Sequence, residues 1–176
     1  EETGAAQLLR DAKILTIYEG TTAIQANDLV GRKTSRDGGR TARAVASRIE
    51  ATEAELAARG SVACRAMARR LKAAREAFLD AVDFVCSQSK SSPNAVFAGS
   101  VPYLMLTGTL VAGWQMARAL MAAEERLAEG TDAEFMRAKI VTARFYADHS
   151  LNKAASLRDS IVEGADAVTD LALESF

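Results

Sequence analysis

The chain has 176 residues, of which 49% are hydrophobic and 26% are charged, and it contains two prolines. These values fit one soluble helical domain that is large enough to bury a core. Abundant alanine and scarce alternation of β-branched residues favour helices, and no strand-like run bounded by turn signals stands out, which argues against a β-sheet protein.

The formal net charge of −1 is unevenly distributed along the chain. Residues 1–31 carry a charge of −3, residues 32–75 carry +8 and residues 76–176 carry −6. A basic segment can bind nucleic acid, but these arginines are scattered through alanine-rich sequence without the interleaved aromatic residues of a nucleic-acid platform. We therefore expect a solvated helix face that pairs with acidic neighbours, and no nucleic-acid partner.

The N-terminal segment contains one carboxylate in an unusual setting. Residues 17–22 read Ile-Tyr-Glu-Gly-Thr-Thr, so that Glu19 lies between Tyr18 and Gly20 just ahead of an expected helix start. A carboxylate between apolar and aromatic neighbours before a glycine has no evident structural role, which makes Glu19 a candidate catalytic group. Tyr18 can simply pack against other side chains.

Two local interactions are expected around this motif. Thr22 and Gln25 have the spacing of a capping box, in which each side chain bonds the main chain of the other residue. Arg10 and Asp11 are expected to pair at the end of the opening helix. The polar, glycine-rich stretch from Gly31 to Gly39 then favours a boundary between the motif segment and the remainder of the chain.

Two long helices are predicted after this boundary. The first covers about residues 40–58 and stops before Gly60, a residue type typical of helix C-termini. The second covers about residues 61–90 and carries an apolar seam at three- and four-residue spacing, which packs helices at small crossing angles. The members of this seam are Cys64, Met67, Leu71, Ala74, Phe78, Ala81 and Val85.

The two cysteines fall within this second predicted helix. Cys64 and Cys86 are 22 residues apart, which at about 1.5 Å per residue places them about 33 Å apart. Bridged Cα atoms lie within about 7 Å of each other, so the two thiols are predicted to stay free. A reducing, cytoplasmic setting is the default expectation.

A third helix is predicted over about residues 93–129, with Ser92 as N-cap and Pro93 at its first position. No charge occurs from Ser91 to Ala117, which is long enough to cross a bilayer. Polar residues and glycines lower its hydropathy, and the amphipathic neighbouring helices need apolar cover, so a buried central helix is favoured over a membrane span. The small residues that would let a neighbouring helix come close are Gly108, Ala112, Gly113 and Ala117.

A fourth helix is predicted to open with a capping box at residues 131–134 and to continue to about Ile161. His149, the sole histidine of the sequence, has no partner with metal-ligand spacing, so we expect a surface or packing residue and no metal site. Residues 163–176 are expected to form a short helix or an ordered tail. The predicted seam of the fourth helix is Met136, Ile140, Ala143, Ala147, Leu151, Ala154 and Ile161.

The motif and its flanks, about residues 7–33, resemble the base-bearing segment of the acyl-CoA dehydrogenases. The resemblance rests on the Tyr-Glu-Gly-Thr core at residues 18–21 and on the trailing Ile24 and Gln25. Enzymes of that family need an N-terminal helical domain, a middle β domain and a C-terminal helical domain to enclose their flavin. Because 176 residues cannot hold all three, and because the chain starts without methionine or an apolar leader, we expect a C-terminal fragment of a longer enzyme.

The resemblance and the helix pattern together define an all-α fold. We expect an up-and-down helical bundle of about four long helices, preceded by two short helices of an acyl-CoA dehydrogenase catalytic domain. Residues 1–34 would end that catalytic domain, and residues 35–176 would form a C-terminal extension. Such an extension resembles the one in larger subgroups, which include 3-methylmercaptopropionyl-CoA dehydrogenase-like enzymes.

The resemblance also assigns roles to the motif residues. Glu19 would take the α proton of an acyl-CoA thioester while FAD takes the β hydride, and an apolar pocket would raise the pKa of Glu19 above its reference of about 4.3. Tyr18 and Gly20 would contact the substrate, and the main-chain N–H of Glu19 would help to hold the thioester carbonyl. The residues implied in FAD binding are Thr21, Thr22 and Gln25, although the capping box alone would account for the last two.

Partners and alternatives follow from the same resemblance. The parent enzyme would act on acyl-CoA, form a homo-oligomer such as a dimer or tetramer, and pass electrons to an electron-transfer flavoprotein, whereas an acyl-CoA oxidase-like enzyme would use oxygen. Ala23 replaces the polar residue that many relatives carry at this position, which puts any contact there in doubt. A competing hypothesis makes residues 40–176 an interaction module for dimerisation, for a membrane or for an electron acceptor.

Overall fold

The computed structural model describes residues 4–16, 21–170 and 174, and all regular secondary structure in them is helical. The all-α prediction is therefore confirmed. The elements are α1 (Ala5–Lys13), a 3-10 helix (Ile14–Thr16), α2 (Thr22–Asp28), a π-helix (Leu29–Ser35), α3 (Arg40–Arg59), α4 (Val62–Gln88), α5 (Pro93–Ala98), α6 (Ser100–Ala128), α7 (Ala133–His149), a second 3-10 helix (Leu151–Lys153), α8 (Ala154–Val162) and α9 (Ala165–Thr169).

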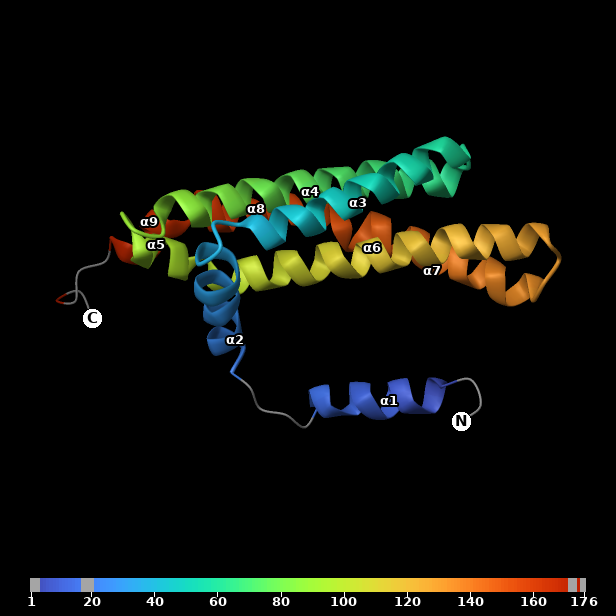
Figure 1. The fold of residues 1–176 in the computed structure, drawn as a ribbon, viewed down its shortest axis with the longest axis horizontal. Helices are drawn as coiled ribbons and strands as arrows, with labels where there is room; N and C mark the ends of the chain where they lie inside the picture. Colours follow the sequence, from blue (N-terminus) through green and yellow to red (C-terminus); the bar gives the residue numbers. More distant parts are fainter. Residues whose placement is uncertain (1–3, 17–20, 171–173, 175–176) are drawn as a thin grey trace.

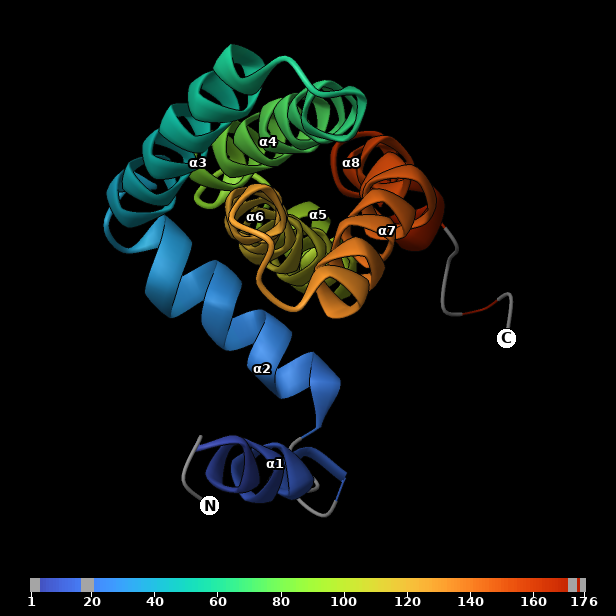
Figure 2. The same ribbon diagram turned by 90° about the vertical axis from the view of Figure 1, so that its right-hand side faces the viewer.

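The long helices form an up-and-down bundle. In Figure 1, α3, α4, α6 and the successive helices α7 and α8 run along the long axis of the molecule, and the chain reverses direction from each to the next. Seen from the end in Figure 2, α2 leaves the bundle from the side of α3, and α1 lies apart from the long helices. The arrangement matches the predicted four-part bundle with two short helices in front of it.

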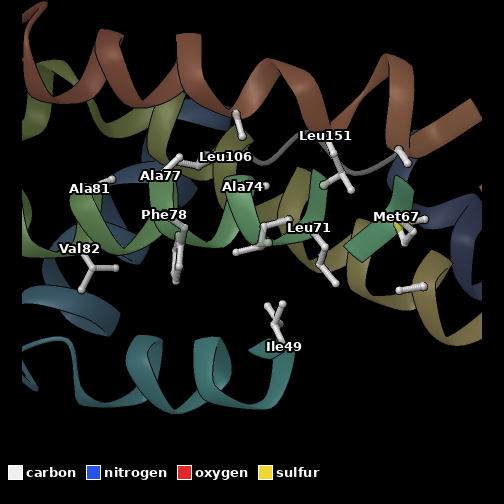
Figure 3. Close-up of a cluster of buried hydrophobic side chains, with 14 of the residues drawn as sticks. Ile49, Met67, Leu71, Ala74, Ala77, Phe78, Ala81, Val82, Leu106 and Leu151 are labelled. Carbon is white, nitrogen blue, oxygen red and sulfur yellow. The ribbon is translucent and has the colours of Figure 1, made fainter. Parts of the chain in front are cut away.

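Helix α4 lies at the centre of the hydrophobic core. All seven predicted members of its seam are buried, and the most exposed of them, Phe78, has a relative solvent exposure of 4%. In Figure 3, Ile49 of α3 points toward Leu71 of α4, whereas Leu151 lies on the opposite side of α4. Since each side of α4 faces a different helix, its seam holds the whole bundle together.

Two of the predicted long helices are interrupted, which corrects the sequence analysis. The third predicted helix breaks at Gly99 into α5 and α6, and a Cβ at Gly99 would lie 3.1 Å from the Cα of Ile161. The fourth breaks at the 3-10 helix that begins at Leu151. At the first break two backbones pack closely, and at the second the side chain of Leu151 packs against the backbone at Gly113. These are tertiary contacts, which the local spacing of apolar residues does not predict.

Close packing at the predicted small residues is confirmed at Gly113. A Cβ at Gly113 would lie 2.5 Å from a methyl carbon of Leu151, so the leucine fills the space that the missing side chain leaves. Gly108 does not take part, because a Cβ there would meet nothing within 4 Å.

Among the residues that the structure describes, no helix combines the length and the apolar character that crossing a membrane requires.

The helix caps agree with the sequence only in part. Helix α3 ends before Gly60, as expected, and Gly60 is its C-cap residue with φ +73°. At the start of α4, the Ser61 hydroxyl accepts a hydrogen bond from the Cys64 N–H at 2.9 Å. The predicted box at residues 131–134 is absent, because Asp132 occupies the N-cap of α7 with φ +47° and its side chain makes no capping bond. Both cysteines are free thiols, as predicted.

The expected boundary at residues 31–39 is more ordered than its composition indicates. Residues up to Ser35 continue α2 as the π-helix, in which Val30 and Thr34 are buried. Only Gly38 and Gly39 have the positive φ angles typical of a glycine turn, at +66° and +77°. The division into residues 1–34 and 35–176 therefore stays a prediction.

A buried ion pair joins α3 to α4. The Arg75 Nε atom donates to one carboxylate oxygen of Glu53 at 2.8 Å, and its Nη2 atom donates to the other at 3.0 Å. Both residues are only 8% exposed. In such a fork the two charges satisfy each other, but removal of one leaves the other buried without its main partner.

We expect Glu53→Ala to lower the free energy of unfolding by about 3 kcal/mol, because Arg75 would lose its buried counter-charge. Asp83→Ala is the matched control, since it breaks the exposed Arg43–Asp83 pair between the same two helices and should cost less than about 1 kcal/mol. Urea unfolding followed by circular dichroism measures both values. Equal losses in the two variants would contradict the assigned role of the buried pair.

Candidate functional site

The first turn of α2 holds the described part of the predicted site. Helix α2 begins at Thr22, with Thr21 as its N-cap residue, and the Gln25 N–H donates to the Thr21 carbonyl at 3.2 Å. The predicted capping box between Thr22 and Gln25 is wrong, because Thr22 already lies inside the helix, one position beyond the place where its hydroxyl could cap it. The Thr21 side chain makes no capping bond either.

All three polar side chains at this helix start face solvent. Thr21, Thr22 and Gln25 are exposed, as is Ala23, and none of the three polar groups bonds within the described part of the chain. The predictions for Tyr18, Glu19 and Gly20 lie outside the described residues. The structure therefore places the three cofactor-binding candidates together on one exposed turn and leaves the catalytic and substrate candidates untested.

The π-helix that continues α2 is fixed to the bundle by a hydrogen bond between two buried hydroxyl groups. The Thr34 Oγ1 atom donates to the Leu29 carbonyl at 2.9 Å and lies 3.0 Å from the Tyr103 Oη atom. Because the single Thr34 proton is used by the carbonyl, the Tyr103 hydroxyl donates to Thr34. The Tyr103 ring in turn stacks on Phe78 of α4, with ring centroids 5.9 Å apart.

Its buried position makes the Tyr103 hydroxyl a weaker acid than that of an exposed tyrosine. Burial raises the pKa of Tyr103 to about 12, although the hydrogen bond with Thr34 acts in the opposite direction. Sequence reasoning missed the pair, because the two residues are 69 positions apart. The signal in the sequence was the tyrosine itself, since a buried phenol needs a hydrogen-bond partner.

Helix α1 packs differently from the rest of the chain. None of its residues is buried. Leu8 and Leu9 are 71% and 72% exposed, and Leu15 in the adjoining 3-10 helix is 80% exposed. The expected Arg10–Asp11 pair is not formed among the described residues, and Gln7 donates to the Asp11 carboxylate at 2.8 Å instead. We call α1 and the adjoining 3-10 helix, residues 5–16, the arm. Exposed apolar side chains gathered on one such segment are typical of a surface that another polypeptide covers.

No metal centre emerges from the described residues. They contain no group of three or more histidine, cysteine, aspartate or glutamate side chains placed to hold an ion. His149 is exposed and stacks on the ring of Phe145, with centroids 4.4 Å apart. It therefore lies at the surface in contact with an aromatic neighbour on its own helix.

Comparison with known proteins gives one consistent family. A family model described as "Acetyl-CoA dehydrogenase C-terminal like" matches residues 45–172. The chain is 51% identical over 173 residues to 3-methylmercaptopropionyl-CoA dehydrogenase of Ruegeria pomeroyi, an alignment that covers 98% of this chain and 29% of the relative.

More distant relatives have related names. The chain is 35% identical to the broad-specificity linear acyl-CoA dehydrogenase FadE5 of Mycobacterium tuberculosis, over 88% of this chain and 26% of the relative. It is 30% identical to butyryl-CoA dehydrogenase of Syntrophomonas wolfei, over 83% and 24% respectively. The chain thus spans less than a third of the length of each of these relatives.

We expect Tyr103→Phe to remove a tyrosine that ionises near pH 12, the value to which burial raises this pKa from 10.0. The folded chain holds that proton more tightly than the unfolded chain does, so the resulting stabilisation is complete below pH 10 and is lost as the pH rises to about 12. The variant should lack this loss, and at neutral pH it should be less stable by about 1 kcal/mol through the missing hydrogen bond.

Ultraviolet titration of tyrosinate and urea unfolding at several pH values test this expectation. Tyr146→Phe is the matched control, because its hydroxyl bonds to the Thr109 carbonyl at 3.0 Å and has no contact with Thr34. An unchanged titration near pH 12 in Tyr103→Phe would show that the assignment is wrong.

Proposed function

Because the chain belongs to the family described as Acetyl-CoA dehydrogenase C-terminal like, we propose that it is the C-terminal part of an FAD-dependent acyl-CoA dehydrogenase. The reaction would be the α,β-desaturation of an acyl-CoA thioester. The observation that carries the proposal is the presence of the motif at residues 17–22 in a chain that aligns over nearly its whole length with a relative named as an acyl-CoA dehydrogenase.

Glu19 is the proposed catalytic base. Its carboxylate takes a proton from the α carbon of the thioester, so that the electrons of the broken C–H bond move toward the carbonyl and the new double bond. Enclosure among apolar groups would raise the pKa of a glutamate and make its ionised form a stronger base. The main-chain N–H of Glu19 would stabilise the charge that develops on the thioester oxygen.

The residues at the start of α2 fit a polar cofactor. A bound FAD would supply the acceptor for the hydride that leaves the β carbon. The hydroxyls of Thr21 and Thr22 and the amide of Gln25 are exposed and make no bond within the described residues, and their exposure on one helical turn suits contact with polar groups. The first N–H groups of a helix also lack partners within the helix. Tyr18 and Gly20 would contact the substrate.

The exposed arm supports a place within a larger enzyme. The leucines of α1 and of the following 3-10 helix are largely exposed in the described part of the chain, and the family requires further domains around the flavin. The α3–α8 bundle would then serve as a scaffold beside the catalytic segment. In the proposed parent enzyme, two or four copies assemble in the cytoplasm and an electron-transfer flavoprotein receives the electrons.

In the parent enzyme, we expect Glu19→Gln to retain FAD and acyl-CoA binding but to slow flavin reduction by about 10²–10⁴-fold, because the amide cannot take the α proton. The measurement is the loss of oxidised-flavin absorbance after anaerobic mixing with acyl-CoA. Asp11→Asn is the matched control, since it removes an exposed carboxylate of α1 from the same arm. Unchanged flavin reduction in Glu19→Gln would rule out Glu19 as the base.

The isolated chain should neither retain FAD through gel filtration nor oxidise acyl-CoA, because the β domain that supplies most of the flavin contacts is absent. Absorbance of the purified chain and a dye-reduction assay check both points. A yellow and active preparation of these 176 residues would contradict the proposal that the chain holds only part of the site.

A further inference from the structure

An apolar cavity lies where the π-helix meets the bundle. Its volume is about 150 Å³, it is partly open to solvent, and it is bounded by the π-helix, α3, α4 and α6. Apolar atoms make up almost all of its lining. The largest apolar side chains in its wall are Leu29, Val45, Phe78, Leu110 and Val111.

The hydroxyl groups in the wall are already engaged. Thr34 and Thr107 each donate to a main-chain carbonyl of their own helical segment, at 2.9 and 2.8 Å, and Thr41 donates to the carboxylate of Asp37 at 2.5 Å. The Tyr103 hydroxyl bonds to Thr34. A water molecule needs two to four polar partners to be stable in a cavity. The interior of this cavity therefore favours an apolar occupant over water.

Lys33 adds a positive charge at the edge of this apolar space. Of the described residues that line the cavity, Lys33 alone is charged, and its side chain is exposed to solvent. Lysine covers apolar surface with its stem while its ammonium group stays in water, so the charge is expected at the opening. Lys33 makes no ion pair within the described part of the chain.

The size of the cavity limits the occupant. An engineered protein cavity of about 150 Å³ with an apolar lining binds benzene, which has six carbon atoms. An aliphatic tail of about five or six carbons has a similar volume. A longer chain would have to extend out of the opening past Lys33.

From the volume, the apolar lining and the lysine in its wall, which forms no ion pair with the other described residues, we propose that this cavity binds a short-chain carboxylate. The aliphatic tail lies among Val45, Phe78 and Leu110, and the carboxylate pairs with the ammonium group of Lys33. Thr21 and Thr22, the described residues of the proposed catalytic motif, are not among the described residues that line this cavity, and the inference uses no residue of that motif.

Amide NMR spectra of the 176-residue chain during titration with hexanoate test the proposal. Hexanoate should shift the resonances of the lining residues in a saturable manner. At equal ionic strength, 1-hexanol should bind more weakly and hexylammonium most weakly, because they lack the negative charge. Absence of saturable shifts at the lining residues, or binding of hexylammonium as tight as that of hexanoate, would overturn the proposal.

Two pairs of variants separate the charge from the cavity. Lys33→Met should weaken hexanoate binding about fivefold and leave 1-hexanol unaffected, whereas the exposed control Lys90→Met should change neither. Ala42→Leu fills the cavity from α3 and should abolish binding of both compounds, whereas Ala44→Leu on the exposed side of α3 should preserve it. Hexanoate binding that survives Ala42→Leu unchanged would place the ligand elsewhere and refute the assignment.

Discussion

Burial of the apolar seam of α4 is the constraint on which the rest of the molecule depends. The seam runs the length of a 27-residue helix, and α3, α6, α7 and α8 all pack against that helix. Each of them covers a part of α4 that would otherwise face water, so the arrangement of the bundle follows from the need to enclose one helix on several sides. Arg75, the one buried charge of α4 in the described core, is tolerated there because Glu53 of α3 bonds it twice.

The seam also determines where the motif segment points. Phe78 of α4 stacks on Tyr103 of α6, and Tyr103 donates to Thr34 of the π-helix. Through these contacts the core fixes the C-terminal end of the segment whose start carries Thr21 and Thr22. A π-helix widens the helical turn and is frequent at functional sites. Here Thr34 of the π-helix lies in the core, and an apolar cavity beside Phe78 is left unfilled by the described side chains.

The sequence predicted the helices well where a local period reports burial. The seam of α4 and the glycine end of α3 are examples, because both depend on residues that are close in the chain. It failed where distant segments meet, as at Gly99 against Ile161 and at Gly113 against Leu151. For the site, the motif at residues 17–22 could be recognised in the sequence. The Thr34–Tyr103 pair could not be predicted, because it is a tertiary contact between distant residues. The cap at Thr22 was wrong because the helix starts one residue earlier than the capping box requires.

The exposed leucines of α1 also determine how stability is distributed along the chain. Because α1 buries none of its residues, it can unfold locally without exposing any of the core, and its opening free energy is decoupled from that of the bundle. Amide exchange and proteolysis would therefore begin in the arm while the bundle is still native. Domains of a parent enzyme that cover Leu8 and Leu9 would bury part of α1 and so raise its opening free energy toward that of the bundle.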